Sequence, residues 1–488
     1  DSIREEDTVS RQGGDEFAIL LGGIDSPFQG EQMLQRLINT VAHPYFINDH
    51  SISISASIGV SLYPDDNADL DTLLRHADQA MYQAKLAGKN RFQLFNAEHD
   101  QQSIQKHNRL SDIEKAMSND ELQLYYQPKV SMKTGDVFGA EALIRWIHPE
   151  KGIIPPLDFL PTIEGTELEV QLGKWVIKQA LKQLDIWNKQ GIKLEVSVNI
   201  SSNHLQSSTF FAHLDAALSE HPNINSNLLQ LEILESSALG DLAAISNIIK
   251  TCQDVLGVNV ALDDFGTGYS SLTHLRNLPA NTIKIDQTFV RDILDDPNDF
   301  SIIDGIIGLA ESFNRDIIAE GVESTEHGLM LLLMGCDKVQ GYGIARPMPA
   351  NDLAKWLSEY TPNQNWLDYG NKYHSAKEIK IKLLRLTTQH WYEKFEQAFQ
   401  SADEDNNKWP LVNHKKCHHG AWIERAKKEQ LFSIAWLENL DQMHERMHLI
   451  ANKVIVKHQK NKASITQSDF EAFKATFNDM NMILGQYE

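Results

Sequence analysis

The chain has 488 residues, of which 42% are hydrophobic and 23% are charged, and its formal net charge is −22. This composition is typical of a soluble globular protein with roughly three domains of about 150 residues each. The negative charge argues against a nucleic-acid polymer as a partner bound through a broad basic face, although bound cations still allow an anionic substrate.

The sequence also limits the cellular location that we expect. It contains no run of about 18 apolar residues and no signal peptide, so we expect no membrane contact in this fragment. Cys252, Cys336 and Cys417 are too few and too scattered for a disulfide framework, which favours the cytoplasm. The chain starts at Asp1, partway into a recognisable unit, and we interpret it as a fragment of a longer protein.

The first region alternates strand and helix patterns. Residues 11–21, RQGGDEFAILL, combine a Gly-Gly turn, two acids and an apolar strand. Alternation of polar and apolar residues predicts a second strand over 51–62, and helical spacing predicts an amphipathic helix over 70–86. The run GGDEF at 13–17 resembles the GGDEF family of diguanylate cyclases, as do ASIGVSLYP and ADQAMYQAKLAGKNRF. We therefore assign residues 1–96 to the C-terminal part of a GGDEF domain, a partial α/β domain.

This resemblance implies roles for several residues. The family uses the glycines and acids at Gly13, Gly14, Asp15 and Glu16 to approach a guanine nucleotide and hold Mg²⁺, and its product-binding RxxD motif falls at Arg4 and Asp7. The family's earlier strands, with another metal-binding Asp, lie upstream of Asp1. We therefore expect no cyclic di-GMP synthesis from this segment.

After a polar, helical connector over 96–118, strand and helix patterns alternate for about 250 residues, which predicts a (β/α)8-type barrel over 104–358. Polar residues recur where the β-rich runs end. The carboxyl ends of parallel barrel strands meet on one face, so we expect these side chains to converge there. They are Glu141, Asn199, Glu232, Asp263, Asp264, Lys284, Glu320 and Gln340.

The chemistry of this set points to divalent cations. Converging carboxylates repel one another unless cations neutralise them, and oxygen ligands with one amide suit two Mg²⁺ or Mn²⁺ ions. Two such ions can activate a water and stabilise both oxygens of an in-line phosphodiester displacement. Lys284 either positions that water, neutralises phosphate charge, or serves as an ion-pair partner for the acids.

The motifs of this region resemble the EAL family of cyclic di-GMP phosphodiesterases. The matching runs are YYQPKV, EAL followed by IRWIHPEKGIIPP, SVNIS, DDFGTGYSSL, IKID, AEGVE and QGYGIARPM. The resemblance implies a barrel, usually a homodimer, that hydrolyses cyclic di-GMP to linear pGpG.

The resemblance also implies a role for each matching residue. Glu141, Asn199, Glu232 and Asp263 would hold one metal, and Asp263, Asp264 and Glu320 the second. Lys284 would serve the nucleophilic water, and Glu235 would hold the loop 265–272. Substrate and site geometry would involve Gln127, Leu143, Arg145, Glu323 and Gln340.

One departure from the family pattern is Leu234, which stands where the family favours Thr and which lacks a hydroxyl hydrogen bond. We expect reduced or differently tuned activity. Leu234 also keeps open a non-catalytic cyclic di-GMP receptor as an alternative, and a bifunctional cyclase and phosphodiesterase in the full-length protein is a second alternative.

From Tyr373 onward the pattern becomes helical, which predicts a small bundle over 373–488. His444 and His448 are four residues apart on one predicted helix face, and with Cys417 and His390 they complete a tetrahedral His₃Cys set for Zn²⁺. The region resembles the chemoreceptor zinc-binding (CZB) domain in its His, Cys-x-x-Gly-x-Trp and His-x₃-His pattern.

His414, His418 and His419 crowd Cys417 and rank below these four as ligands. Four protein ligands leave no open position for water, so we expect a structural zinc with a sensory role. Zinc occupancy or oxidation of Cys417 would then act on the barrel through the connection at 347–372.

Overall fold

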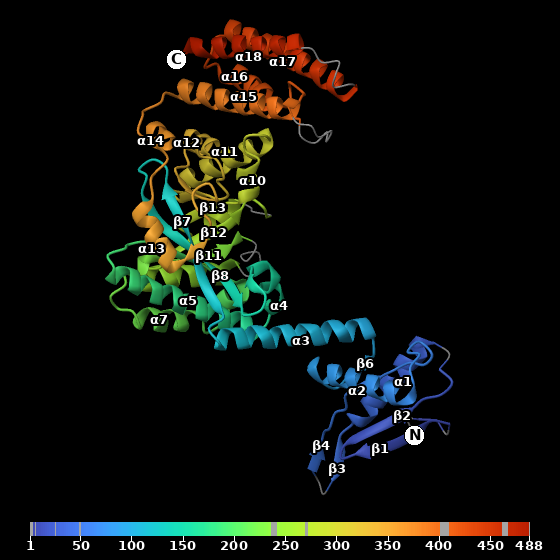
Figure 1. Ribbon diagram of the computed structural model, residues 1–488. Coiled ribbons are helices and arrows are strands. Elements are labelled where there is room, and N and C mark those ends of the chain that lie inside the picture. The colour runs from blue at the N-terminus through green and yellow to red at the C-terminus, as the bar shows by residue number, and fades with distance from the viewer. Residues whose placement is uncertain are drawn as a thin grey trace. The chain divides into compact units, whose positions relative to one another are not determined.

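A computed structural model describes residues 3–4, 6–24, 26–47, 50–235, 242–268, 272–400, 409–460 and 467–487 (Figure 1). The chain divides into two compact units, Asp1–Ile113 and Glu114–Glu488, which are described separately below. Among the described helices, none has both the length and the apolar character that crossing a membrane requires.

The first unit consists of short strand pairs and two amphipathic helices. Its elements are β1 (Thr8–Gly13), β2 (Glu16–Leu20), α1 (Pro27–Val41), β3 (Tyr45–Ile47), β4 (His50–Ile52), β5 (Ile58–Val60), α2 (Leu70–Leu86) and β6 (Phe92–Leu94), followed by α3 (Ala97–Ser118), which continues into the second unit. The predicted helix over 70–86 is confirmed, and the side chain of Asp69 caps its first turn. The predicted strand over 51–62 is instead divided between β4 and β5, which belong to different pairs.

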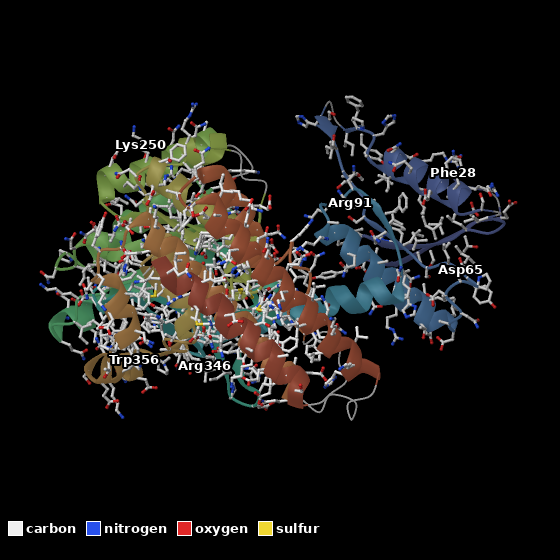
Figure 2. All side chains as sticks on the ribbon, turned by 90° about the horizontal axis from the view of Figure 1, so that it is seen from above. Phe28, Asp65, Arg91, Lys250, Arg346 and Trp356 are labelled. Carbon is white, nitrogen blue, oxygen red and sulfur yellow. The ribbon has the colours of Figure 1, made fainter. Side chains whose placement is uncertain are left out.

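The hairpin of β1 and β2 carries the GGDEF run at its turn. Gly14 has φ +51°, a left-handed conformation that glycine adopts without steric cost. The two strands pair only with each other among the described residues, and apolar side chains such as Phe17 and Leu20 are 60% and 69% exposed. Phe28 on α1 is similarly exposed (Figure 2). The described residues therefore leave this hairpin without a core layer.

The second unit contains the predicted barrel. Its eight strands are β7 (Leu122–Ser131), β8 (Val137–His148), β10 (Glu195–Ile200), β11 (Leu229–Leu234), β12 (Asn259–Phe265), β13 (Thr282–Ile285), β14 (Asp316–Ala319) and β15 (Lys338–Gln340), and pairing of β7 with both β8 and β15 closes the ring. The prediction of an α/β barrel is confirmed. One strand differs from a fully parallel barrel, because β7 runs antiparallel to both neighbours.

Helices surround the strands (Figure 1). They are α4 (Leu160–Ile163), α5 (Glu167–Lys189), α6 (Ser202–Leu205), α7 (Phe210–Ser219), α8 (Leu242–Thr251), α9 (Leu272–Asn277), α10 (Gln287–Arg291), α11 (Pro297–Ser312), α12 (Thr325–Met334), α13 (Ala350–Glu359) and α14 (Gln364–Gly370), with β9 (Gly152–Ile154) and β16 (Met348–Pro349) as added edge strands. In α5 the residues Leu172, Val176, Ala180 and Leu184 recur at helical spacing and are buried. This apolar stripe covers one side of the barrel.

The C-terminal bundle consists of α15 (Ala376–Gln400), α16 (His418–Glu429), α17 (Ile434–Lys460) and α18 (Gln467–Leu484). Aromatic side chains fill its core. Phe395 and Phe473 are fully buried with ring centroids 4.3 Å apart, and Tyr392 stacks on Phe477 at 4.1 Å. The apolar stripes of the helices meet in this core, as the helical spacing of the sequence predicts.

Candidate active site and a second metal cluster

The strand register brings the predicted acids and amides to one end of the barrel. Gln127 on β7 lies opposite Glu141 on β8, and Asn199 on β10 lies beside Glu232 on β11. Leu234, at the end of β11, pairs with Asp263 on β12. Side chains alternate between the two faces of a strand, so every second residue of these strands shares one face.

Glu141 is held by two amides. Asn199 donates from Nδ2 to one carboxylate oxygen at 2.8 Å, and Gln340 donates from Nε2 to the other at 2.7 Å. Gln340 also donates to Gln127, which in turn donates to the carbonyl of Ala345 at 3.1 Å. The Asn199 amide oxygen is then available to a cation, and the carboxylate of Glu141 has a fixed orientation.

Lys284 lies among four carboxylates and is fully buried. Its ammonium is 2.5 Å from Glu320, 2.7 Å from Glu232, 2.9 Å from Asp263 and 3.6 Å from Glu141. Burial by itself would lower the pKa of Lys284, but the surrounding carboxylates raise its pKa well above the usual value. The lysine is therefore a permanent cation at the centre of the site.

One lysine does not neutralise all the acids. Burial, reinforced by the neighbouring carboxylates, raises the pKa of Glu232 to about 8, and burial together with Asp263 raises that of Asp264 to about 7. The pKa of Glu320 is also raised, mainly by burial. For Glu141, Lys284 and the two amides outweigh burial and lower the pKa. Buried carboxylates that resist ionisation need additional positive charge, which divalent cations supply.

The carboxylate oxygens form two overlapping clusters. Oxygens of Glu141, Glu232 and Asp263 lie within 4.8 Å of one another, and so do those of Asp263, Asp264 and Glu320. Asp263 belongs to both clusters. In addition, Glu232 Oε1 is buried and has no hydrogen-bond partner within the described part of the chain. These residues fit a pair of oxygen-ligated cations with one shared carboxylate.

A break in the regular strand allows Asp263 and Asp264 to join the same cluster. Consecutive strand residues normally point to opposite faces. Here the register shifts between Leu262 and Phe265, and Asp264 adopts φ +52°, a conformation that is uncommon for residues other than glycine. Asp286, which caps α10, lies beside Asp264, and a proton shared between the two carboxyl groups helps to raise the pKa of Asp264. The sequence pattern of the IKID motif pointed only to its lysine, because the contact between Asp286 and Asp264 depends on how β12 and β13 pack.

The remaining predicted residues differ in their surroundings. Glu235 accepts a hydrogen bond from the backbone N–H of Gly266 at 2.9 Å and so holds the start of the loop at 265–272, of which residues 269–271 lie outside the described residues. Leu143 and Arg145 follow Glu141 at alternate positions of β8 and are half-buried, whereas Glu323 is exposed.

A second buried lysine was not predicted. Lys129 on β7 donates to Ser197 at 2.5 Å, to Glu195 at 3.0 Å and to Gln230 at 3.2 Å. It is fully buried, and Glu195 is its one carboxylate partner among the residues that the structure describes. Nothing in its sequence context, YYQPKV, distinguished it from a surface lysine.

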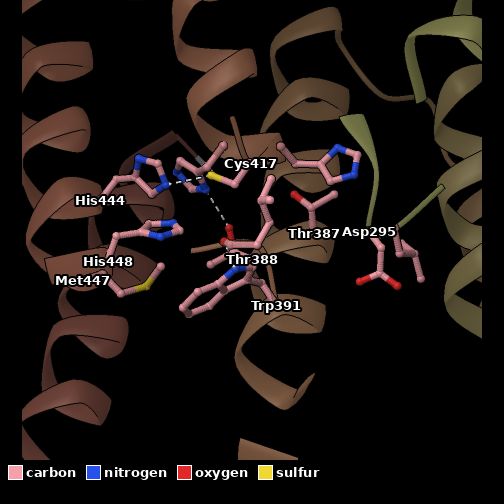
Figure 3. A pocket seen from close by; sticks show the side chains of 12 residues that line it. Asp295, Thr387, Thr388, Trp391, Cys417, His444, Met447 and His448 are labelled. Atoms are coloured by element: carbon pink, nitrogen blue, oxygen red, sulfur yellow. Dashed lines mark hydrogen bonds between the residues drawn. The ribbon is translucent and has the colours of Figure 1, made fainter. Parts of the chain in front are cut away.

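The C-terminal bundle brings together three of its four predicted zinc ligands. Donor atoms of Cys417, His444 and His448 lie within 4.8 Å of one another, and Cys417 Sγ is 3.1 Å from His444 Nε2 (Figure 3). His390 is a correction, because it does not join them. Its Nε2 lies 3.2 Å from the carboxylate of Asp295 in the barrel.

The donor chemistry of this cluster fits a soft divalent cation. His448 Nδ1 donates to the carbonyl of Val412 at 2.9 Å, which leaves Nε2 with its lone pair free. Burial lowers the pKa of His448 to about 4 and that of His444 well below its usual value, so both are neutral at pH 7. Burial raises the pKa of Cys417 to about 11, and a bound cation would favour its thiolate. Beside these residues is a cavity of about 30 Å³.

Comparison with known proteins agrees with the geometry. Residues 110–347 match the EAL domain, and residues 1–91 match the diguanylate cyclase GGDEF domain. The chain belongs to the EAL family. It is 38% identical over 353 residues to the bifunctional diguanylate cyclase/cyclic di-GMP phosphodiesterase MucR of Pseudomonas aeruginosa, covering 72% of this chain and 51% of that protein.

A second curated protein and a solved structure are also similar to this chain. The cyclic di-GMP phosphodiesterase PdeR of Escherichia coli is 39% identical over 359 residues, covering 73% of this chain and 54% of that protein. A solved structure of the EAL enzyme Bd1971, with cAMP and cyclic di-GMP bound, is 28% identical with a TM-score of 0.50, and the match covers 60% of this chain and 77% of that one. The chain spans about half the length of the curated relatives that it matches.

Proposed function

We propose that the barrel is a phosphodiesterase that hydrolyses one phosphodiester bond of cyclic di-GMP and releases linear pGpG. The observation that carries this proposal is the position of Asp263 in both carboxylate clusters, next to the buried Lys284. The names of MucR and PdeR support the substrate.

The proposed chemistry divides between cations and side chains. Two Mg²⁺ or Mn²⁺ ions, held by Glu141, Asn199, Glu232, Asp263, Asp264 and Glu320, would activate water and stabilise the oxygens of the displacement. The guanidinium of Arg145, on the same face of β8 as Glu141, is suited to bind a substrate phosphate. Lys284 keeps a positive charge beside the carboxylates, where it orients the attacking water.

Product formation tests the proposal. Wild-type protein with Mg²⁺ or Mn²⁺ should convert cyclic di-GMP to pGpG, measured by chromatography. Glu141→Ala should abolish product, because it removes a carboxylate of the first cluster. Glu311→Gln is the matched control, because Glu311 is an exposed acid outside both clusters. An active Glu141→Ala variant would contradict the assignment.

Two alternatives make different predictions for the same assay. A cyclic di-GMP receptor would bind the nucleotide without product, and the observation that favours it is the apolar Leu234 beside Asp263. A bifunctional enzyme would also convert GTP to cyclic di-GMP, and the name of MucR together with the GGDEF match favours it for the full-length protein. The homodimer and the cytoplasmic location stay predictions from the sequence.

For the C-terminal bundle we propose a structural zinc site built on Cys417, His444 and His448. The neutral imidazoles and the buried thiol support it, because zinc prefers nitrogen and sulfur donors. Zinc content measured after purification, in wild type and in Cys417→Ser, tests it. Equal zinc in the two proteins would contradict it.

We further propose that this site regulates the barrel through Asp295, a route that the sequence did not reveal. Asp295 accepts from Lys394 at 2.8 Å and from His390 at 3.2 Å, both on α15. Although burial opposes ionisation, these two partners lower the pKa of Asp295 to about 2. Asp295 also borders the cavity beside Cys417.

The same short segment reaches the proposed active site. Asp286, nine positions before Asp295, caps α10 and lies beside Asp264, whose pKa it raises through a shared proton. A rearrangement of the bundle at Asp295 would therefore act on a proposed metal ligand through one helix. Zinc removal should change the rate of pGpG formation in wild type, and the change should shrink in Asp295→Asn. An equal response in both proteins would contradict this route.

A further inference from the structure

Among the described residues the proposed zinc site has three grouped donors once His390 is assigned to Asp295, whereas a structural zinc site is tetrahedral. His419 is not one of the three residues whose donor atoms lie within 4.8 Å of one another, but it adjoins one of them, His444. His419, in the first turn of α16 and two residues after Cys417, is 5% exposed. Its ring stacks on that of His444, with centroids 4.6 Å apart.

The hydrogen bonds of Thr388 fix the tautomer of His419. The Thr388 hydroxyl has one proton, which it donates to the carbonyl of Leu384 at 2.6 Å. Because that proton is already used, the Thr388 hydroxyl oxygen accepts a hydrogen bond from His419 Nδ1–H, at a distance of 2.8 Å. In a neutral imidazole the other nitrogen then carries the lone pair. That nitrogen, Nε2, is buried and has no partner among the described residues.

A buried acceptor without a partner is costly, about 1–3 kcal/mol for a neutral group, and a ligand to it removes this cost. In His448 the Nδ1 donates to the carbonyl of Val412, so in the neutral ring Nε2 carries the lone pair. In metal sites the second ring nitrogen of a ligating histidine usually makes this kind of hydrogen bond. Both histidines thus have the tautomer that ligation through Nε2 requires.

We propose that His419 Nε2, in place of His390, is the fourth zinc donor beside Cys417, His444 and His448, and that Thr388 positions it. Figure 3 shows Thr388 directed toward this group of side chains from α15. The inference rests on the proposed zinc site. It gives the site a Cys-x-His pair at the start of α16 and a His-x₃-His pair on α17.

Two neighbouring histidines compete for this role. The ring of His418 contacts Phe300 of the barrel, with centroids 5.9 Å apart, and so faces the interface between the barrel and the bundle. His414 is half-buried, and its ring lies 6.2 Å from that of His444 and 6.5 Å from that of His448. Neither is as deeply buried as His419.

The test measures metal binding to the full chain, by competition with a chromophoric chelator for Zn²⁺ and by the absorption of bound Co²⁺. His419→Asn retains a donor toward Thr388 but removes Nε2. It should weaken zinc binding by about 100-fold or more, because loss of a direct ligand exceeds the 10–100-fold typical of an outer partner. The tetrahedral Co²⁺ bands should also change.

Thr388→Val provides a second readout, because it removes the hydroxyl at nearly constant volume. It should weaken zinc binding by about 10–100-fold while the tetrahedral Co²⁺ spectrum is retained. His390→Gln and His414→Asn are the controls and should leave both measurements unchanged. Circular dichroism establishes that each variant retains its helical content.

The outcomes separate the two levels of the proposal. Wild-type affinity in His419→Asn, with loss of binding in Cys417→Ser, would overturn the role of His419 and leave the zinc site intact. Loss of binding in His414→Asn or His390→Gln instead would overturn it in favour of that residue. If Cys417→Ser also binds zinc as wild type does, the zinc site itself is wrong.

Discussion

Replacing Lys284 by methionine should destabilise the cation-free barrel. The variant keeps a side chain of similar length but removes the one positive charge in contact with Glu320, Glu232, Asp263 and Glu141, at 2.5, 2.7, 2.9 and 3.6 Å. Removing one partner from a buried ion pair typically costs about 3–5 kcal/mol. We expect a loss of about 3 kcal/mol at pH 7 in EDTA, because part of the cost is relieved when carboxylates take up protons.

The loss of unfolding free energy in Lys284→Met should increase as the pH rises. The pKa of Glu232 in the folded protein is about 8, above its ordinary value of 4.5. Such a group contributes stability that is complete below pH 4.5 and is lost as the pH rises toward 8, by up to about 1.4 kcal/mol per pH unit for each proton. Without Lys284 the other carboxylates should behave similarly, so the difference between variant and wild type should grow from pH 5 to 8.

Urea unfolding with and without Mg²⁺ measures both effects. Mg²⁺ should restore part of the stability of Lys284→Met, because cations replace the missing charge. Lys129→Met is the matched control, since Lys129 is equally buried but, within the described ranges, contacts one carboxylate, that of Glu195. The stability that Lys129→Met loses should not be restored by Mg²⁺. The reasoning would be refuted by a Lys284→Met variant as stable as wild type in EDTA at pH 8.

Three further substitutions test separate parts of the chain. Leu234→Thr should raise the rate of pGpG formation by about 2–10-fold, the value of one added hydrogen bond, whereas Leu234→Val, whose side chain has the shape of Thr without the hydroxyl, should not. Gly341→Ala should lower the free energy of unfolding by about 3 kcal/mol in urea, because its Cβ would lie 2.2 Å from the Val322 carbonyl oxygen. Phe473→Ala, in the bundle core, should cost about 3–5 kcal/mol and lower the thermal midpoint of the bundle; an unchanged midpoint would contradict the packing.

The sequence by itself determined the fold class and the residue types of the active site. Alternating strand and helix patterns predicted the barrel, and the polar ends of its β-rich runs predicted which side chains converge, because parallel strands place equivalent ends on one face. Helical spacing likewise predicted the bundle and the pair formed by His444 and His448.

Only the tertiary structure decided how these residues are oriented. Asp263 and Asp264 are consecutive, and a regular strand would separate them, but a local shift in register and a positive φ bring both carboxylates together. On α15 the sequence favoured His390 as a zinc ligand, yet Thr388 contacts His419 beside the proposed zinc site, and His390 contacts Asp295. Both outcomes depend on partners far away in the chain. Local periodicity places a residue on a helix or strand, whereas the side chain's partner depends on which elements pack against it.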